Sequence, residues 1–388
     1  MAGYIINLDN KKSLINYIKN GVYSTKIKIP QDNIWRSQHE GTFADYITMN
    51  PGDNIFFFIK RKIYGIGELV NVGDDCKYLN FPEANLPKQY EYQEIREELL
   101  WDEGLEDSSQ RWVCLFKPSP HFFKQGIDMD DVLSSNPSKF RMLRAFWKLS
   151  FIKIDDEENK ALINVILRFN QKSKSNNNNI IPSLYENTHK QIRNKVETDN
   201  SYKFNIKDIL LACLDKDKIR HEMAIEAALL FQLSNQHEKV TRIFGKWDYL
   251  SHQVVASPFK PIDYMDKMDV FGYSFIQGFD YTRSKFLLIE IKKDSGSKED
   301  IEQIMKYIDW VKEEYAFGDY SMINAFLVAY DYSNEVISHG KEVGVRKYTI
   351  GRRPAYTKEW SNLKFVEYRF NRNENALDFY LIDEKSKL

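Results

Sequence analysis

Two acids and a lysine in the C-terminal half have the types and spacing that bind a divalent metal. Asp269 lies in the segment KMDVFGYS, and Glu290 and Lys292 end the apolar segment FLLIEIKKD. Side chains alternate between the two faces of a strand, so Glu290 and Lys292 share a face. An acid and a lysine at the polar end of an apolar strand are costly to bury unless they bind something. We therefore expect Asp269 and Glu290 to be metal ligands on neighbouring strands.

The oxygen ligands favour Mg²⁺, with Mn²⁺ as a substitute. Mg²⁺ prefers hard oxygen ligands, keeps several waters and binds phosphate groups. Such an ion lowers the pKa of a bound water and stabilises charge on a phosphodiester. Lys292 could orient that water or neutralise charge in the transition state. The alternative is that Glu290 and Lys292 are simply a solvated strand end, as most pairs of this kind are.

Neighbouring segments add further polar side chains to this set. Glu222 and Glu226 are four residues apart and share one face of a predicted helix, so the sequence does not separate them as the helical acid of the site. We favour Glu222. Gln303 and Tyr307 have the same spacing on a later predicted helix and are expected to face the site together.

The order Asp269, then Glu290-Ile291-Lys292, then Gln303-x-x-x-Tyr307 resembles the PD-(D/E)xK nuclease superfamily, especially its RecB-like branch with a Q-x-x-x-Y helix. The resemblance covers about 206–368. It implies an α/β nuclease domain with a mixed central sheet, in which Asp269 and Glu290 bind the metal and Lys292 is the catalytic lysine. It also implies that Gln303 and Tyr307 face the site, and that Glu222 or Glu226 supplies the helical acid. The proline that often precedes the aspartate is missing.

The elements that must position these residues follow from hydrophobic periodicity. Helices are predicted over Arg220–Leu233 and Lys298–Tyr315. Their order with the strands suits a mixed sheet flanked by helices. The predicted strands are Tyr249–Ala256, Met268–Phe275, Lys285–Lys292, Ser321–Tyr332, Arg346–Ile350 and Leu363–Tyr368.

The N-terminal half is rich in aromatic residues. Its pattern predicts a smaller α+β domain around a curved sheet. A basic turn, Lys60-Arg61-Lys62, joins two apolar strands. Aromatic residues are usually core, but exposed ones beside basic groups could stack a flipped base. The predicted strands are Gly3–Leu8, Asn54–Lys60, Ile63–Val70 and Arg111–Phe116, and the predicted helices are Lys11–Asn20, Met129–Leu133 and Asn136–Leu149.

The segments Ile6–Thr25, Gly52–Val70 and Arg111–Leu133 resemble the YTH domain and its PUA-superfamily relatives, the EVE domains. The resemblance covers roughly residues 3–150 and implies a domain that binds a modified base. Tyr23 stands where that family has a cage tryptophan, and Trp101 lies in the interval of a second cage wall. We assign base binding to Tyr23, Trp35 and Trp101.

Composition and charge limit the remaining possibilities. The chain has 388 residues, of which 43% are hydrophobic, and a net charge of −1. This is enough apolar material for two folded domains, and it has no apolar run near the ~20 residues that span a bilayer. We expect a base-reading domain at 1–170, a polar linker with an asparagine run at 171–205 and a nuclease domain at 206–388. The N-terminus lacks the pattern of a signal peptide, and the three cysteines are too scattered for a disulfide framework or a zinc ribbon. A lone histidine such as His221 or His252 is more often structural than a ligand.

Together these features predict a cytoplasmic, prokaryotic DNA endonuclease of a restriction or defence system. Its N-terminal domain would select a modified base in double-stranded DNA, and its C-terminal domain would cut the backbone, as a homodimer because two strands need two sites. The alternatives are a nuclease that reads unmodified DNA by sequence, and a non-catalytic nucleic-acid-binding protein. The side chains expected to contact the DNA backbone are Lys60, Arg61, Lys62, Lys293, Arg352 and Arg353.

Overall fold

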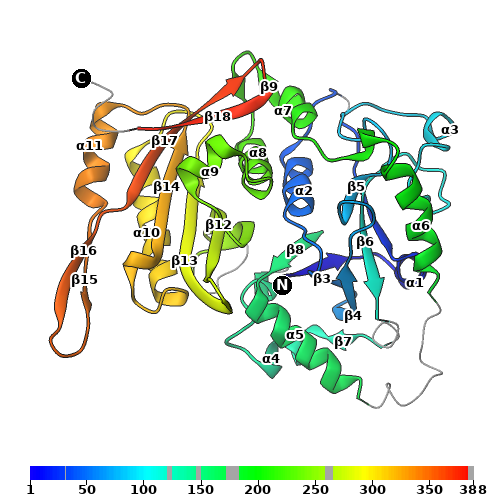
Figure 1. The fold of residues 1–388 in the computed structure, drawn as a ribbon, viewed down its shortest axis with the longest axis horizontal. Helices are drawn as coiled ribbons and strands as arrows, with labels where there is room; N and C mark the ends of the chain where they lie inside the picture. Colours follow the sequence, from blue (N-terminus) through cyan, green and yellow to red (C-terminus); the bar gives the residue numbers. More distant parts are fainter. Residues whose placement is uncertain (31, 120–124, 146–149, 172–182, 258–264, 383–388) are drawn as a thin grey trace. The chain divides into compact units, whose positions relative to one another are not determined.

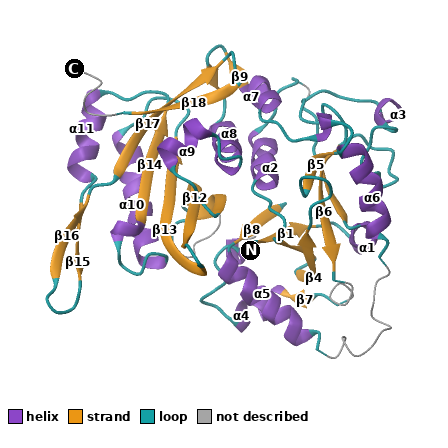
Figure 2. Cartoon of the chain, in the orientation of Figure 1, coloured by secondary structure: helices purple, strands orange, loops and turns teal. Residues whose placement is uncertain are grey.

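The computed structural model divides the chain into two compact units. Unit 1 comprises residues 1–35 and 45–208, and unit 2 comprises residues 36–44 and 209–388. The structure describes residues 1–30, 32–119, 125–145, 150–171, 183–257 and 265–382. Both units combine helices with mixed β-sheets, as the ribbon and its secondary structure show (Figures 1 and 2). Among the described residues, no helix combines the length and the apolar character that crossing a bilayer requires.

Unit 1 is built on a curled mixed sheet with the strand order β2-β6-β4-β3-β1-β8, to which β5 and β7 add at β6 and β4. The pair β1–β3 is parallel, whereas β1–β8, β3–β4, β4–β6 and β2–β6 are antiparallel. The strands are β1 (Gly3–Asn7), β2 (Val22–Lys26), β3 (Asn54–Ile59), β4 (Lys62–Leu69), β5 (Lys77–Leu79), β6 (Gln110–Pro118), β7 (Ile127–Asp128) and β8 (Phe151–Ile154).

One hydrophobic core of unit 1 combines residues of this sheet with residues of α5 (Asp156–Phe169). Ile5, Phe56 and Ile152 from the strands belong to it together with Leu162 and Ile166 of the helix, and all five are buried. The described helices of unit 1 also include α1 (Lys11–Asn20), α3 (Tyr92–Ile95), α4 (Met129–Ser135) and α6 (Tyr185–Val196), with short 3₁₀ turns at Leu143–Ala145 and Asn200–Tyr202. Helix α2 (Ser37–Ile47) begins in unit 2 with residues 37–44 and ends in unit 1 with residues 45–47.

The expected helix over 136–149 is wrong within the described residues. The chain there forms a short 3₁₀ turn at Leu143–Ala145, and residues 146–149 lie outside the described part. The carboxylate of Glu158 accepts hydrogen bonds from the backbone N–H groups of Met142 and Leu143, at 3.1 and 2.8 Å. These contacts replace the intrahelical bonds that a continuous helix would make there.

The segment expected to be a linker at 171–205 is largely structured where it is described. Residues 172–182 lie outside the described part, but α6 and the 3₁₀ turn at Asn200–Tyr202 follow them within unit 1. Ile192, Val196 and Tyr202 are buried, and the Lys195 ammonium donates to the carbonyls of Glu97 and Leu99. Sparse apolar residues at helical spacing are easily missed in a polar sequence, which explains the difference.

Unit 2 is built on a six-stranded mixed sheet with the order β11-β12-β13-β14-β17-β18. β13–β14 and β14–β17 are parallel, and the outer pairs are antiparallel. A separate hairpin, β15–β16, extends from this unit (Figure 1). The strands are β9 (Leu214–Asp215), β10 (Lys218–Ile219), β11 (Tyr249–Val255), β12 (Lys267–Ile276), β13 (Phe279–Ile291), β14 (Ile323–Ala329), β15 (Arg346–Ile350), β16 (Tyr356–Trp360), β17 (Leu363–Asn371) and β18 (Ala376–Leu381).

Helices cover both faces of this sheet. Phe244 of α9 contacts Phe326 of β14, whereas Tyr315 at the end of α10 contacts Phe286 of β13, which faces the other way. α10 begins at a capping box in which the Ser297 hydroxyl accepts from the Asp300 N–H. The helices are α7 (Lys207–Cys213), α8 (Glu222–Ser234), α9 (Glu238–Phe244), α10 (Lys298–Glu314) and α11 (Asn334–Val343), with a 3₁₀ turn at Tyr320–Met322.

Glu158 makes the stability of unit 1 dependent on pH. Burial raises the pKa of Glu158 to about 8 from its ordinary value of 4.5, so between these values the folded state holds a proton that the unfolded state releases. The free energy of unfolding of unit 1 therefore falls as the pH rises from about 4.5 to about 8, by up to about 1.4 kcal/mol per pH unit.

Glu158→Gln, which cannot ionise, is expected to lack this fall. Denaturant unfolding at several pH values, combined with hydrogen exchange of the α5 and β1 amides, measures it. The stability difference between wild type and variant should shift in favour of the variant from pH 5 to pH 8. A difference that stays constant across this range would contradict the prediction.

Candidate active site

The two predicted metal-binding acids lie where β12 and β13 diverge. The ladder between these strands ends at the pair Val270–Ile289, immediately before Asp269 and Glu290. Asp269 Oδ2 accepts a hydrogen bond of 2.7 Å from the backbone N–H of Ile291. The sheet itself therefore holds Asp269 beside the end of β13, at the edge of the apolar core.

Lys292 follows the last residue of β13 and holds Glu290. Its ammonium donates to Glu290 Oε1 at 2.8 Å and lies 3.7 Å from Asp300 Oδ1 at the start of α10. Burial alone would lower the pKa of Lys292, but the charges of Glu290, Asp269 and Asp300 raise it above its usual value. Lys292 is therefore a fixed positive charge beside the acids.

Glu290 is the most deeply buried acid on the strands, with 1% of its surface exposed. Burial raises its pKa well above the ordinary value, and the nearby charge of Asp269 raises it further. Among the described residues, its second oxygen, Oε2, has no hydrogen-bond partner. A buried carboxylate oxygen without a partner is costly, and a bound cation would remove that cost.

Gln253 on β11 joins Asp269 to an acid of α8. Its side-chain amide donates to both oxygens of Glu226 at 3.1 Å and to Asp269 Oδ1 at 3.2 Å. Burial raises the pKa of Asp269 to about 6, and burial followed by the charge of Asp269 raises that of Glu226 well above its usual value. The two carboxylates thus share one amide in an environment that penalises their charges.

The preference for Glu222 as the helical acid does not agree with this geometry. Glu222 is half-buried and accepts a long hydrogen bond of 3.4 Å from the backbone N–H of Lys293. Glu226, one turn later on α8, is 2% exposed and linked to Asp269 through Gln253. Both acids are near the site, but Glu226 is the one that joins its hydrogen-bond network.

Gln303 and Tyr307 meet on one face of α10. The Gln303 amide donates to the Tyr307 hydroxyl at 2.7 Å, and Tyr307 is buried. Burial raises the pKa of Tyr307 to about 12, and the charges of Glu290 and Asp269 add to the effect. Gln303 and Tyr307 therefore share one face of α10, as their spacing predicts.

The donor set fits a hard divalent cation, although the carboxylates are spread in this conformation. The ligand atoms of the acidic site do not all lie within 4.8 Å of one another. Within the described residues, the one group of three acidic, histidine or cysteine side chains that meets this limit is Glu40, Cys213 and His221, outside the acidic site. At the acidic site, Asp269 and Glu290 would hold the ion, and Glu290 Oε2 is the oxygen without a partner. Mg²⁺ keeps several waters, so two carboxylates suffice as protein ligands.

Sequence reasoning missed Gln253 and Lys267. Gln253 occupies a left-handed position at φ 52° in β11, where the pairing with β12 skips from His252 to Val254. Nothing in the segment SHQVV signals this left-handed residue. Lys267 lies two residues before Asp269 on the same strand face, a spacing that could have been noticed, and burial lowers its pKa.

The predicted backbone-contacting residues occupy different surfaces. Arg352 and Arg353 lie in the exposed turn of the β15–β16 hairpin, and Lys293 is exposed beside the acidic site, 3.7 Å from Asp294. In unit 1, Lys60, Arg61 and Lys62 are exposed at the β3–β4 turn, where Arg61 pairs with Asp130 at 2.7 Å.

The predicted base-binding residues in unit 1 do not form one open cage. Trp35 is 1% exposed, its indole N–H donates to the Asn85 carbonyl, and Arg111 lies over its ring. It is therefore a core residue and offers no face for a base. Trp101 is 6% exposed and packs on Tyr17, with 5.4 Å between ring centres.

Tyr23 contributes to the wall of a cavity of about 690 Å³ in unit 1, although only 5% of its surface is exposed. Its ring meets that of Tyr17 edge to face, and both tyrosines line the cavity. The remaining wall is polar, and residues that contribute to it include Asn7, Asn10, Lys12, Ser24, Thr25, Lys26 and Glu103.

Comparisons with known proteins identify no family for the chain. No family model matches it, and no curated protein matches it. Among solved structures, it is similar to a repair endonuclease from Pyrococcus abyssi, with 19% sequence identity and a TM-score of 0.22. The match covers 34% of this chain and 47% of that structure, so the chain spans about half of the protein it matches.

Proposed function

We propose that unit 2 is a metal-dependent nuclease that hydrolyses phosphodiester bonds in DNA. The observation that carries this proposal is the cluster of Glu226, Asp269 and Glu290 beside Lys292 where two strands diverge. Several buried acids with raised pKa values and one fixed cation are expensive for folding, and such arrangements concentrate at functional sites. The order of these residues along the chain also follows the superfamily pattern.

Each side chain has a definable part in this chemistry. A bound Mg²⁺ would activate water and stabilise charge on the phosphate. Asp269 and Glu290 would hold the ion. Lys292 stays protonated, because the surrounding acids raise its pKa, and it neutralises charge on the scissile phosphate. Tyr307, supported by Gln303, offers a hydroxyl that can orient a phosphate oxygen or a water.

We further propose that unit 1 selects the DNA, through the cavity lined by Tyr17 and Tyr23. A flipped base could stack on an aromatic wall, while the polar residues around it bond to the base edge. A cavity that can hold a flipped base is consistent with selection of a modified base. We therefore propose that the protein is a nuclease of a prokaryotic defence system that acts on DNA with such a base. The second candidate is a nuclease that reads unmodified sequence, because the cavity carries two recessed tyrosines, Tyr17 and Tyr23, where a tryptophan cage would be expected.

Digestion of one plasmid, prepared with and without modified bases, tests the whole proposal. Cleavage should require Mg²⁺ or Mn²⁺, stop with EDTA and favour the modified plasmid. Equal cleavage of both plasmids would support the sequence-reading alternative. Absence of cleavage under every metal and substrate condition would contradict nuclease activity.

Removing either strand acid should abolish cleavage and spare the fold. Asp269→Asn and Glu290→Gln each take one ligand from a two-carboxylate site, and the remaining carboxylate holds Mg²⁺ poorly against water. Plasmid cleavage and a DNA-binding assay measure the effect, with binding expected to persist. The control is Glu302→Gln, an exposed acid of α10 beside Gln303, which should keep wild-type activity. Wild-type cleavage by Glu290→Gln would refute the site.

The two α8 acids should differ in their effects. Glu226→Gln breaks the network that joins α8 to Asp269, whereas Glu222→Gln removes only a long contact with the Lys293 N–H. We expect Glu226→Gln to lower the cleavage rate at saturating Mg²⁺ by about 10²–10³-fold, in the range for losing one preorganised polar group, and Glu222→Gln to have a smaller effect. The reverse order would restore Glu222 as the helical acid.

Base selection should depend on the Tyr23 wall. Stacking of a base on an aromatic ring contributes roughly 1–3 kcal/mol, so Tyr23→Ala should weaken binding to modified DNA by about ten- to a hundredfold and leave nonspecific binding nearly unchanged. Binding is measured in the Glu290→Gln background to prevent cleavage. Tyr23→Phe, which keeps the ring, is the matched control. Equal affinity of the full chain for modified and unmodified duplexes would overturn the modified-base proposal.

A further inference from the structure

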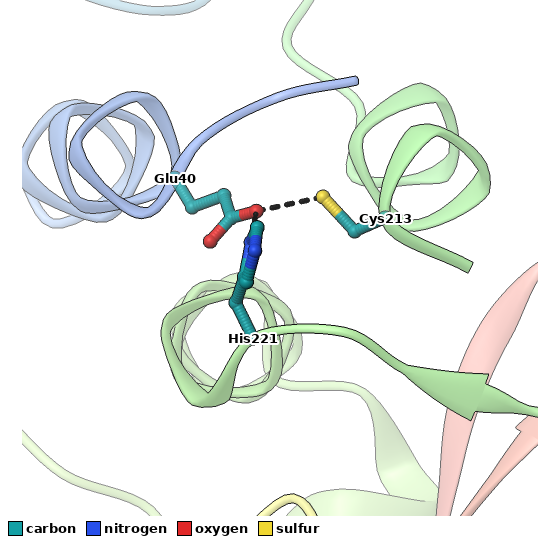
Figure 3. Close-up of side chains that lie close together, drawn as sticks. All are labelled: Glu40, Cys213 and His221. Atoms are coloured by element: carbon teal, nitrogen blue, oxygen red, sulfur yellow. Dashed lines mark hydrogen bonds and ion pairs between the residues drawn. The ribbon is translucent and has the colours of Figure 1, made fainter. Parts of the chain in front are cut away.

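A second group of ligand-type side chains lies in unit 2, away from the strand acids. Glu40 comes from α2, Cys213 is the last residue of α7, and His221 immediately precedes α8. Glu40 Oε1 lies 2.7 Å from Cys213 Sγ and 2.9 Å from His221 Nδ1. Figure 3 shows all three side chains converging on one point from separate segments.

The burial of this group leaves one oxygen unsatisfied. Glu40 and Cys213 are both 0% exposed, and the His221 side chain is 32% exposed. In the part of the chain that the structure describes, Glu40 Oε2 has no hydrogen-bond partner. A buried carboxylate that lacks a partner on one oxygen is destabilising unless a cation binds there.

We propose that Glu40, Cys213 and His221 bind one Zn²⁺ ion. Thiolate, imidazole and carboxylate are the zinc ligands of proteins, and the sulfur selects zinc over Mg²⁺. All three ligand atoms lie within 4.8 Å of one another. Ligand atoms around a tetrahedral zinc lie roughly 3.3–3.7 Å apart, so the distances from Glu40 Oε1 to Cys213 Sγ and to His221 Nδ1 need to lengthen by about 1 Å or less.

Glu40 Oε2 or a water would complete the coordination. Binding requires the thiolate, so the Cys213 proton leaves to solvent as zinc enters. Nucleophilic catalysis by Cys213 fits less well, because its sulfur is buried and hydrogen-bonded to an acid rather than to histidine, which is the base that activates such a thiol.

The proposed ion would hold the start of α8. His221 is the N-cap residue of that helix and makes no capping hydrogen bond through its side chain. The ion would join it to residues 36–44 and to the end of α7, all within unit 2. Glu226 lies little more than one turn further along α8, so the zinc would act as a structural support for the helix that carries this acid.

Cobalt substitution tests the proposal on the full chain. Co²⁺ bound to a cysteine thiolate gives a sulfur-to-metal charge-transfer absorption that carboxylates cannot produce, so the strand acids do not interfere. Wild type should show this absorption, lose it when Zn²⁺ is added, and carry about one zinc per chain by elemental analysis. Absence of the absorption in wild type would overturn the proposal without any variant.

Matched variants locate the ligands. Cys213→Ser, His221→Gln and Glu40→Gln should each lose or strongly weaken the absorption and the zinc-dependent rise in melting temperature. Three controls should keep both signals: Cys76→Ala for another buried thiol, His237→Gln for an exposed histidine, and Glu290→Gln for a strand acid. Persistence of the absorption in Cys213→Ser, or its loss in Cys76→Ala, would refute the assignment. Because Glu290→Gln separates the two sites, failure of nuclease activity would leave this result unaffected.

Discussion

The burial of several like charges at one end of a sheet is the constraint on which unit 2 depends. Glu226 and Glu290 are 2% and 1% exposed, and Asp269 shares the Gln253 amide with Glu226. Desolvation and mutual repulsion both oppose ionisation of these acids, which is why their pKa values rise. One lysine, one glutamine amide and one backbone N–H offset part of this cost. The central apolar strands supply the stability that keeps the acids in place.

The secondary structure around the acids holds them and their hydrogen-bond partners in place. The left-handed residue Gln253 places its amide beside Glu226 and Asp269, and the capping box at Ser297 starts α10 close to Lys292. α8 is buried along most of its length, so Glu226 has few positions available to it. A site held from strands and helices in this way is more precise than one built on loops. The proposed zinc would add one further restraint at the start of α8.

In unit 1, aromatic residues of the core surround a buried charge. The Arg111 guanidinium is fully buried, lies over the rings of Trp35, Phe81 and Tyr90, and donates to the carbonyls of Ala84 and Leu86. Burial lowers the pKa of Arg111 to about 10. The ring contacts and the hydrogen bonds to carbonyl groups replace the hydration that the guanidinium loses. Much of the aromatic content of this unit therefore belongs to its core, whereas Tyr17 and Tyr23 line a cavity.

Elements with strong, local periodicity can be predicted from the amino-acid sequence alone. The helices α1 and α10, the strands β12 to β14 and the positions of Asp269, Glu290 and Lys292 at strand ends follow from hydrophobic patterning, because alternation and helical spacing are set by nearest neighbours. The polar helix α6 is hard to predict from local pattern, because few apolar residues mark its buried face. Helix α5 does carry a local signal, a side-chain cap at Asp155 and apolar residues at helical spacing, which the sequence prediction does not use.

Contacts between residues far apart in the chain can be identified only in the folded structure. Glu222 and Glu226 share a helical face, so their spacing cannot show which one reaches Asp269; the position of Gln253 across the sheet decides it. Likewise, Glu40 lies more than 170 residues before Cys213 and His221. No spacing rule connects residues so distant, because their proximity results from burying apolar surface elsewhere in the unit.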